Sequence, residues 1–506
     1  MVEFDALSWD RVGVSTTVER NPMSAERVLA PTPTAAYRWR WLALAALLLG
    51  EAMNLLDATI VQVAAPAIHG DLGGSVSDIQ WFTTAYTLPF AVLLITGGRL
   101  GDIAGRRRVF VIGVTGFMLA SAACALAPSV GLLVAFRVVQ GASAAVVIPQ
   151  TIGLIKTMFS GDEMSKALGS IGPVMGLAAV CGPVLGGVLT HADLFGSSWR
   201  AAFLVNVPVS LVVLAIAPKM LENRAPERPT LDITGTLLAM IGTGLIVYPL
   251  IGGDIAAMSG WSWGGIAAGL IVMVVFGLHQ RGVAAGGRSP LVEPSLFAHR
   301  GFPAALVTSA SFFAVTNGLM MVIVLQLQLG LGTDVLNAGL TLAPWSVGLA
   351  IASWVAGAHL VRRYGHHTMS LGLAVLLVGA LAAIAVYHTA DPTAYPKPLL
   401  VALGVVGLGV GLFGPAFFTI ALKPLQPQEI GSAAGLLNSL QQLGATLGVA
   451  VLGSVYLNSA EPGGPAESVQ AVQVAFWVAV ALVVVSFASS RLMTEKDASD
   501  KAGAQH

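Results

Sequence analysis

The chain has 506 residues, of which 55% are hydrophobic and only 10% are charged. A soluble domain carries about 25% charged residues, so this composition excludes a soluble globular protein and indicates a polytopic membrane protein. The 26 basic and 26 acidic residues balance, so no general attraction to nucleic acid is expected.

Residues 1–39 are polar and are predicted to form a cytoplasmic N-terminal tail. They contain Pro and Arg but lack the short apolar core and small-residue cleavage site of a signal peptide. Cys124 and Cys181 both lie in apolar runs, so we interpret them as small core residues rather than as a disulfide.

Fourteen apolar runs follow, each near the length of about 20 residues that a bilayer span needs. The predicted spans are 40–68, 79–99, 109–127, 130–156, 165–190, 200–217, 231–251, 261–279, 302–330, 335–360, 368–388, 398–421, 430–457 and 469–490. The predicted fold class is therefore an all-α membrane protein with 14 transmembrane helices.

The basic residues predict the orientation of these helices. If the N-terminus is cytoplasmic, 23 of the 26 Lys and Arg residues lie in the tails, at even-numbered junctions or at the adjoining helix ends. Basic residues concentrate on the cytoplasmic side of membrane proteins. We therefore expect a multi-pass protein of the cell membrane with both termini, including a C-terminal tail at 491–506, in the cytoplasm.

Two long cytoplasmic connections, 218–230 and 280–301, divide the chain into groups of six, two and six helices. The predicted domains are a six-helix bundle at 40–217, a linker with two extra helices at 218–301 and a second six-helix bundle at 302–490. GGRLGDIAGRRR (97–108) is echoed by AHLVRRYGHH (358–367), and aligning their glycines places Arg362 where Asp102 stands. Repeated halves are typical of secondary transporters.

The first helix carries two carboxylates, Glu51 and Asp57. An Asp at the centre of a membrane helix costs roughly 2.5–3.5 kcal/mol, which favours a function for Asp57. The two residues lie about 120° apart round the helix, so they do not form a stacked pair. The alternative for each is a structural hydrogen bond to a neighbouring helix, and for Glu51 the sequence favours neither.

Residues 98–108, GRLGDIAGRRR, predict a tight cytoplasmic turn. Gly98 and Gly105 permit close backbone approach or a positive φ, and Asp102 can cap a helix or pair with an arginine such as Arg106. A simple positive anchor would explain the arginines but not the Gly and Asp spacing, so a gating loop is the favoured interpretation.

The fourth helix contains Arg137, with Gln140 on the same face. A buried guanidinium needs a partner or a water-filled cavity, although a snorkelling arginine is the alternative.

The fifth helix reads GPVMGLAAVCGPVLGGVL (172–189) and has a stripe of small residues that includes Gly182, Gly186 and Gly187, with a kink at Pro183. Such stripes let helices approach closely, so a moving interface and static packing are both open.

Two motif classes are missing from the sequence. It has no GxxxxGK[ST], which argues against an ATP-driven pump, and no HExxH or Cys/His metal spacing. We therefore expect neither a cofactor nor a metal site.

These motifs together resemble the 14-helix drug:proton antiporter family of the major facilitator superfamily. The matching segments are LDATIVQVAAP (56–66), QWFTTAYTL (80–88), GRLGDIAGRRR (98–108), RVVQG (137–141), GPVLGG (182–187) and WRAAFLVNVPV (199–209). The resemblance covers about residues 40–490. Gln62 and Ala65 depart from the usual Asn and Leu, and helix 10 lacks a carboxylate that some members use for dications.

The resemblance implies roles for the motif residues. Asp57 would take part in proton coupling or cation recognition, Arg137 would aid the proton relay, and Glu51 is an unusual second acid. The loop residues Asp102, Gly105 and Arg106 would stabilise one end state, and the Gly182-Pro183 helix would seal an exporter against leak.

The leading hypothesis is a proton-driven exporter of amphipathic, aromatic or cationic compounds, acting as a monomer in the lipid bilayer. Aromatic faces suit cations. Candidate cavity residues are Trp81, Tyr86, Gln140, Phe312, Phe313, Asn317, Gln326, Trp345, Phe417, Phe418, Asn438 and Gln441. A dedicated exporter of one metabolite, antibiotic or lipid has the same fold. A non-transporting sensor or scaffold would not need a buried acid, and a membrane enzyme lacks a nucleophile–base constellation here.

Overall fold

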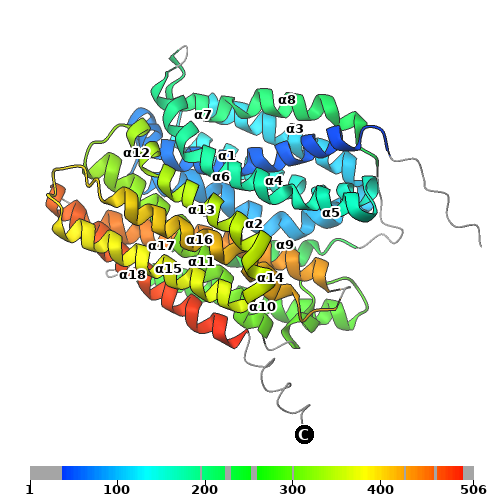
Figure 1. Ribbon diagram of the computed structural model, residues 1–506. Coiled ribbons are helices and arrows are strands. Elements are labelled where there is room, and N and C mark those ends of the chain that lie inside the picture. Colours follow the sequence, from blue (N-terminus) through cyan, green and yellow to red (C-terminus); the bar gives the residue numbers. More distant parts are fainter. Residues whose placement is uncertain are drawn as a thin grey trace, which may run out of the picture. The chain divides into compact units, whose positions relative to one another are not determined.

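A computed structural model describes residues 37–193, 196–222, 230–251, 259–298, 301–426, 429–460 and 464–493. Every regular element within these ranges is a helix (Figure 1). Most of the predicted tails and parts of the predicted 218–301 linker lie outside the described residues.

Among the described residues, fourteen helical spans are long and apolar enough to cross a membrane. The prediction of 14 spans is confirmed, and their ends lie within a few residues of the predicted limits. The first six spans are α1 (Arg40–Leu72), α2 (Asp78–Ala104), α3 (Arg106–Ala125), α4 (Val130–Met158), α6 (Ile171–His191), which the short α5 (Gly161–Gly169) precedes, and a sixth built from η2 (Ser198–Arg200), α7 (Ala201–Leu204), α8 (Asn206–Ile216) and η3 (Ala217–Lys219).

The remaining eight spans follow the same pattern. The two extra spans are α9 (Ile233–Val247) with η4 (Tyr248–Leu250), and α10 (Gly260–Ala285), after which comes η5 (Pro294–Ala298). The last six are α11 (Gly301–Leu325) with η6 (Gln326–Gly330), α12 (Val335–Thr341) with α13 (Ala343–Val355), η7 (Ala356–Leu360) and α14 (Val361–Tyr364), then α15 (His366–Thr389), α16 (Leu399–Leu422), α17 (Ile430–Ser459) and α18 (Pro465–Leu492).

The spans form two six-helix bundles. Figure 1 shows the blue-to-teal helices α1–α8 grouped together, apart from the yellow-to-red helices α13–α18. The bundles meet where α1 packs on α11 and α12, α2 on α17, and α6 on α12 and α13. Glycine permits the closest approach within each bundle, because a Cβ on Gly141 of α4 would overlap the Tyr86 backbone and one on Gly448 of α17 would overlap the Ala314 backbone.

The two extra helices pack on each other and contact both bundles. On α2, Thr96 Oγ1 lies 3.0 Å from Thr236 Oγ1 of α9. On α17, Ser454 Oγ donates to the Leu250 carbonyl at 2.7 Å. The pair therefore bridges the α2–α17 side of the interface between the bundles.

Several spans depart from a continuous α-helix for identifiable reasons. The sixth span breaks at Val205, because Pro208 lacks the N–H that would bond the Leu204 carbonyl. The ninth and tenth spans contain π-helical turns, η6 and η7, and such turns are frequent at functional sites. After the break in the sixth span, α8 begins at Asn206, which is a residue of the site described below.

We call the membrane side at which α1 begins the first side, and the opposite one the second side. On the first side, Arg40 pairs with Glu163 of α5 at 2.8 Å. On the second side, Asp71 accepts hydrogen bonds from Trp199 Nε1 and Arg200 Nη1, both at 2.9 Å. Each contact joins helix ends that the alternation of spans places on one side.

Candidate functional site

Asp57 of α1 lies inside the N-terminal bundle and has no solvent-exposed surface. Its Oδ2 accepts a hydrogen bond from Arg137 Nη1 of α4 at 2.5 Å. Its Oδ1 accepts one from Gln140 Nε2 and one from Asn206 Nδ2, each at 2.8 Å. A buried carboxylate is tolerated when its charge is paired and its lone pairs are filled, and here both conditions are met.

Arg137 is also fully buried, which excludes a snorkelling arginine in this structure. Besides Asp57, it donates from Nη1 to Gln140 Oε1 and from Nε to the Phe82 carbonyl of α2, both at 2.8 Å. Its guanidinium lies 4.4 Å from the centre of the Tyr86 ring, a cation–π contact. Its Nη2 has no hydrogen-bond partner, so two N–H donors are left over.

Ser121 of α3 also belongs to this network. Its Oγ accepts from Gln140 Nε2 at 3.2 Å and from Asn206 Nδ2 at 2.9 Å, and it donates to the Phe203 carbonyl at 2.9 Å. Side chains from α1, α3, α4 and α8 therefore bond one another directly. Ser121 and Asn206 were not predicted, although Asn206 is the lone amide in the WRAAFLVNVPV segment.

Glu51 lies elsewhere. It is 8% exposed, and the Thr151 hydroxyl of α4 lies beside it without a well-formed hydrogen bond. Among the described residues, no basic side chain lies within ion-pair distance of its carboxyl. Gln62, about 20° from Glu51 round α1, donates to the Asn317 carbonyl of α11 at 2.9 Å. Glu51 therefore lies beside α4 of the N-terminal bundle, on the α1 face that it shares with Gln62, and outside the hydrogen-bond network of Asp57.

The 98–108 motif forms a one-residue joint between α2 and α3. Gly105 has φ 101°, a backbone conformation that favours glycine. Asp102 pairs with Arg106 at 2.5 Å, and Arg106 Nη1 reaches the Pro149 carbonyl of α4 at 3.5 Å. Gly98 also faces Pro149. The motif therefore fastens the joint against the end of α4.

The small residues of α6 sit between the two bundles. A Cβ on Gly182 would overlap Thr59 of α1, and one on Gly186 would lie 2.9 Å from the Ile60 carbonyl. On the other face, Gly187 would meet Val335 of α12, and the Pro183 carbonyl lies where Gly339 of α12 would carry a Cβ. Only small residues allow α6 to fit this closely against α1 and α12.

A family model described as Major Facilitator Superfamily matches residues 47–234 and 232–449. The chain belongs to the Major Facilitator Superfamily. It is a multi-pass membrane protein that transports small molecules rather than an enzyme.

Three similar proteins come from Streptomyces. A probable actinorhodin transporter of Streptomyces coelicolor is 42% identical over 431 residues, covering 84% of this chain and 75% of that protein. Puromycin resistance protein pur8 of Streptomyces alboniger is 34% identical and covers 92% and 93% of the two chains. The tetracenomycin C resistance and export protein of Streptomyces glaucescens is 33% identical and covers 84% and 78%.

Solved structures share the fold. An inward-facing, unoccupied bacterial homologue of the human lysosomal transporter Spinster matches with a TM-score of 0.63 at 17% identity, covering 90% of this chain and 98% of that one. A peptide transporter, POT, in complex with sulfate matches with a TM-score of 0.64 at 15% identity, covering 89% and 95%.

The structure distributes the predicted cavity residues over several environments. Tyr86 and Gln140 belong to the buried Asp57 network. Phe312 and Phe417 are buried on either side of Phe413, at ring-centre distances of 3.7 and 5.1 Å, and so form part of the C-terminal core. Core packing, rather than an open surface, accounts for these two phenylalanines.

The other predicted cavity residues also differ in exposure. Trp81 packs on Tyr248 of the extra helices, at 5.8 Å between ring centres. Trp345 and Gln326 are buried, and neither amide atom of Gln326 has a hydrogen-bond partner. The remaining candidates are half-buried and keep the exposure that a cavity lining requires: Phe313, Asn317, Phe418, Asn438 and Gln441.

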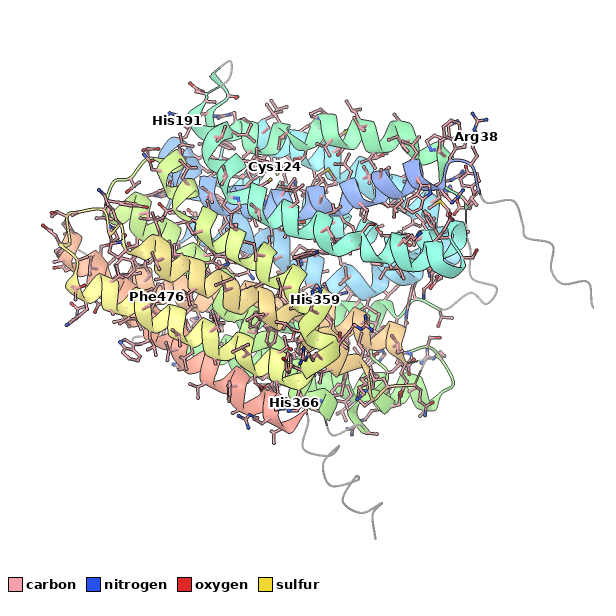
Figure 2. All side chains as sticks on the ribbon, in the orientation of Figure 1. Arg38, Cys124, His191, His359, His366 and Phe476 are labelled. Atoms are coloured by element: carbon pink, nitrogen blue, oxygen red, sulfur yellow. The ribbon has the colours of Figure 1, made fainter. Side chains whose placement is uncertain are left out.

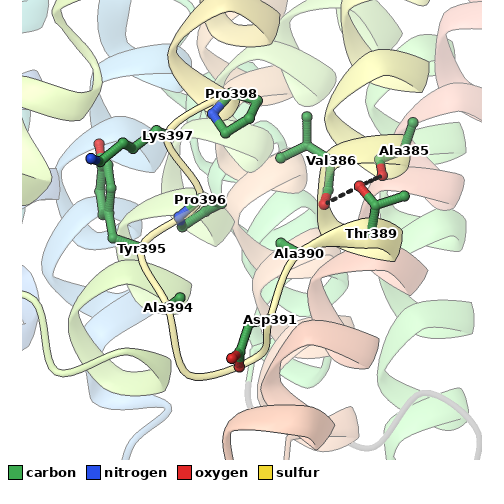
Figure 3. Close-up of a pocket in the computed structure, with 10 residues that line it drawn as sticks. All are labelled: Ala385, Val386, Thr389, Ala390, Asp391, Ala394, Tyr395, Pro396, Lys397 and Pro398. Atoms are coloured by element: carbon green, nitrogen blue, oxygen red, sulfur yellow. Dashed lines mark hydrogen bonds between the residues drawn. The ribbon is translucent and has the colours of Figure 1, made fainter.

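A cavity of about 530 Å³ opens at the connection between α15 and α16 (Figure 3). It is lined by the segment from Ala385 to Pro398, and none of the predicted site residues is among them. The backbone N–H of Thr393 bonds Asp391 and lowers the pKa of that carboxyl. Among the described residues, no group of three or more His, Cys, Asp or Glu side chains is placed to hold a metal ion.

Proposed function

We propose that the chain is a proton-coupled exporter, which moves amphipathic or cationic drugs and toxic compounds out of the cytoplasm by alternating access. The observation that carries the proposal is the full burial of Asp57 and Arg137 in one polar network inside an apolar bundle. Ionisable groups at such depth are costly and are typical of proton relays in transporters. The name of one relative, a tetracenomycin C resistance and export protein, supports export as the direction of transport.

The coupling step follows from the bonds of Asp57. Protonation removes the charge that Arg137 neutralises, and leaves a buried guanidinium whose Nη2 already lacks a hydrogen-bond partner. Arg137 also bonds the Phe82 carbonyl of α2 and Gln140 of α4. A proton on Asp57 therefore changes the forces that hold α1, α2 and α4 together, and biases the bundle toward a second packing.

Glu51 supplies a second carboxyl, which lies beside Thr151 of α4 and shares the α1 face of Gln62, the residue that bonds α11 of the C-terminal bundle. In this position it would take up a proton or a cationic substrate from the interface between the bundles, while Asp57 responds inside the N-terminal bundle. If proton and substrate bind to such groups in competition, each shifts the affinity for the other by the same factor. This reciprocity is what antiport requires.

Alternating access is supported by unequal packing along α6. In its half nearer the second side, Gly187 lies against α12, and nearby Gln328 Nε2 donates to the Val63 carbonyl at 2.8 Å. In its other half, a Cβ on Gly172 or Gly176 would meet no atom within 4 Å. We assign the first side to the cytoplasm, which makes this an inward-open arrangement.

The two sequence motifs then have complementary roles in the cycle. Gly182, Pro183, Gly186 and Gly187 keep α6 sealed against α1 and α12 on the external side. Gly98, Asp102, Gly105 and Arg106 hold the cytoplasmic joint of α2 and α3 in one end state. The protein would act as a monomer. The substrate would bind between the two bundles, at half-buried residues such as Asn317, Asn438 and Gln441.

A dedicated exporter of one antibiotic or metabolite is the second candidate. It is favoured by the 42% identity to a protein named for actinorhodin, a single compound. A panel of unrelated cationic dyes and neutral aromatic antibiotics separates the two candidates, because a dedicated exporter moves one chemical class. A non-transporting sensor or scaffold would move none of them.

The test is uptake of ethidium or Hoechst dye into inverted membrane vesicles that contain the full-length protein, with and without a proton gradient. We expect uptake to stop when an ionophore collapses the gradient, and Asp57→Asn to abolish gradient-driven uptake at wild-type protein levels. Asp71→Asn, at the end of the same helix, is the matched control and should transport normally. Uptake that survives collapse of the gradient would rule out proton antiport.

A further inference from the structure

The joint between α2 and α3 has a counterpart between α14 and α15. Each joint is a single glycine with positive φ, Gly105 at 101° and Gly365 at 52°, and the next helix begins at the following residue. The alignment predicted from the sequence echo is therefore matched in backbone structure. This correspondence makes the charges of the two joints directly comparable.

In the first joint the charges are balanced within the protein. Asp102 pairs with Arg106 at 2.5 Å. Glu222 accepts a hydrogen bond from the Arg107 backbone N–H at 3.0 Å and lies 3.7 Å from the Arg107 side chain. Carboxylates of the chain itself thus offset most of the positive charge at this end of α3.

In the second joint the carboxylate is replaced. Arg362 occupies the place of Asp102, and Arg363 follows it. Among the described residues, no carboxylate lies within ion-pair distance of either guanidinium. Arg362 and Arg363 therefore concentrate exposed positive charge, with no carboxylate counter-ion in the part of the chain that the structure describes.

Further basic side chains extend this patch. His366 and His367, which begin α15, are exposed, and their rings lie 3.9 Å apart. Figure 2 labels His359 and His366 at this end of the bundle, where α18 also ends. We call His359, Arg362, Arg363, His366 and His367 the second-joint cluster.

Aromatic side chains mark the depth of this cluster in the membrane. Trp354, whose ring lies 6.3 Å from that of His359, is 65% exposed. Tyr364 is 48% exposed and lies beneath the Arg363 guanidinium at 5.4 Å. Trp and Tyr are enriched where lipid headgroups meet the hydrocarbon. The cluster therefore lies at the level of the lipid phosphates.

We propose that the second-joint cluster is a binding site for the phosphate of an anionic membrane lipid. Guanidinium groups bind phosphate oxygens through paired, charge-assisted hydrogen bonds, and basic groups on the cytoplasmic side attract anionic headgroups. The lipid phosphate takes the place that the Asp102 carboxylate fills in the first joint. The site needs neither a particular substrate nor proton coupling.

The experiment is native mass spectrometry of the full-length protein released from nanodiscs of mixed phosphatidylcholine and phosphatidylglycerol. Arg362→Gln/Arg363→Gln should lower the preference for bound phosphatidylglycerol by about tenfold. Arg108→Gln/Arg281→Gln removes the same charge from exposed positions elsewhere on the first side. This control should retain the preference, and Arg362→Lys/Arg363→Lys should retain part of it.

Three results would overturn the proposal. The first is a wild-type preference in Arg362→Gln/Arg363→Gln, provided that its thermal unfolding in pure phosphatidylcholine matches wild type. The second is an equal loss in the Arg108→Gln/Arg281→Gln control, which would indicate general surface charge. The third is thermal protection by inorganic phosphate in pure phosphatidylcholine that equals the protection by phosphatidylglycerol, which would indicate a site for free phosphate.

Discussion

The interior of the N-terminal bundle contains a charged pair, Asp57 and Arg137, whereas the interior of the C-terminal bundle contains a stack of three rings. Phe312, Phe413 and Phe417 are buried there, with ring planes tilted by 18° and 14° from one neighbour to the next. Yet both bundles have six spans, and both close the joint after their second span with a glycine.

The difference shows where each bundle can respond to a proton. The three stacked rings contain no group that titrates, so this stack has no direct response to a proton. A buried ion pair is poorly suited to adding stability, because desolvation offsets much of the attraction between the charges. The N-terminal bundle therefore carries a feature whose cost is best explained by transport.

The strongest way to break this contrast is to remove one charge of the pair. Arg137→Leu leaves the Asp57 carboxylate buried without its counter-charge, and we expect a loss of about 3–5 kcal/mol in the free energy of unfolding. Asp57→Leu/Arg137→Leu should regain most of that stability without regaining transport. Thermal unfolding of the purified proteins and dye uptake into vesicles measure the two effects.

A double variant that is as unstable as Arg137→Leu would mean that the pair itself stabilises the bundle. In that case its burial needs no functional explanation, and the comparison between the two interiors loses its meaning.

In the C-terminal bundle the corresponding change is Phe413→Ala, which removes the central ring of the stack. We expect a loss of on the order of 2–3 kcal/mol, below the value for soluble cores because the ring leaves lipid rather than water on folding. Gradient-driven uptake should remain at temperatures where the protein is folded. Phe418→Ala, at a half-buried neighbour, is the control and should unfold close to wild type.

Loss of proton coupling in Phe413→Ala, with the fold intact, would contradict a purely structural role for the stack. The C-terminal core would then take part in the coupling step.

A surface ion pair of the N-terminal bundle, Arg40 with Glu163, sharpens the comparison because we expect it to contribute little to stability. The hydrogen bond from Arg40 lowers the pKa of Glu163 below its ordinary 4.5. Its contribution to stability is therefore present above about pH 4.5 and is lost as the pH falls through the lowered pKa. Glu163→Gln should change the melting temperature by at most about 2 °C at pH 7 and not at all well below pH 4. A larger change at pH 7 would contradict the small contribution to stability that we expect from an exposed ion pair.

Local patterns in the sequence predicted the fold closely. Length and hydropathy located fourteen spans among the described residues. The need of a buried guanidinium for a partner, together with the position of Gln140 one turn away, anticipated that Arg137 is paired. The cytoplasmic orientation of the termini stays a prediction.

Sequence spacing could not show which helices face one another across a bundle. Ser121 and Asn206 join the network only because α3 and α8 pack beside α1 and α4, and no spacing along one chain segment reports that. For the same reason Phe312 and Phe417 were predicted to line a cavity, whereas they lie in a core formed by α11 and α16. An aromatic residue in a membrane helix has similar surroundings in the sequence in both cases.

The complete burial of Asp57 limits the rate at which its carboxyl can exchange a proton. With no exposed surface, its carboxyl can exchange a proton with water only during an opening of the bundle, however fast proton transfer itself is. Collective helix motions take microseconds to milliseconds, far longer than side-chain rotations at an exposed acid. Under the proposed proton coupling, uncoupled proton leak would be limited by the frequency of helix opening rather than by acidity.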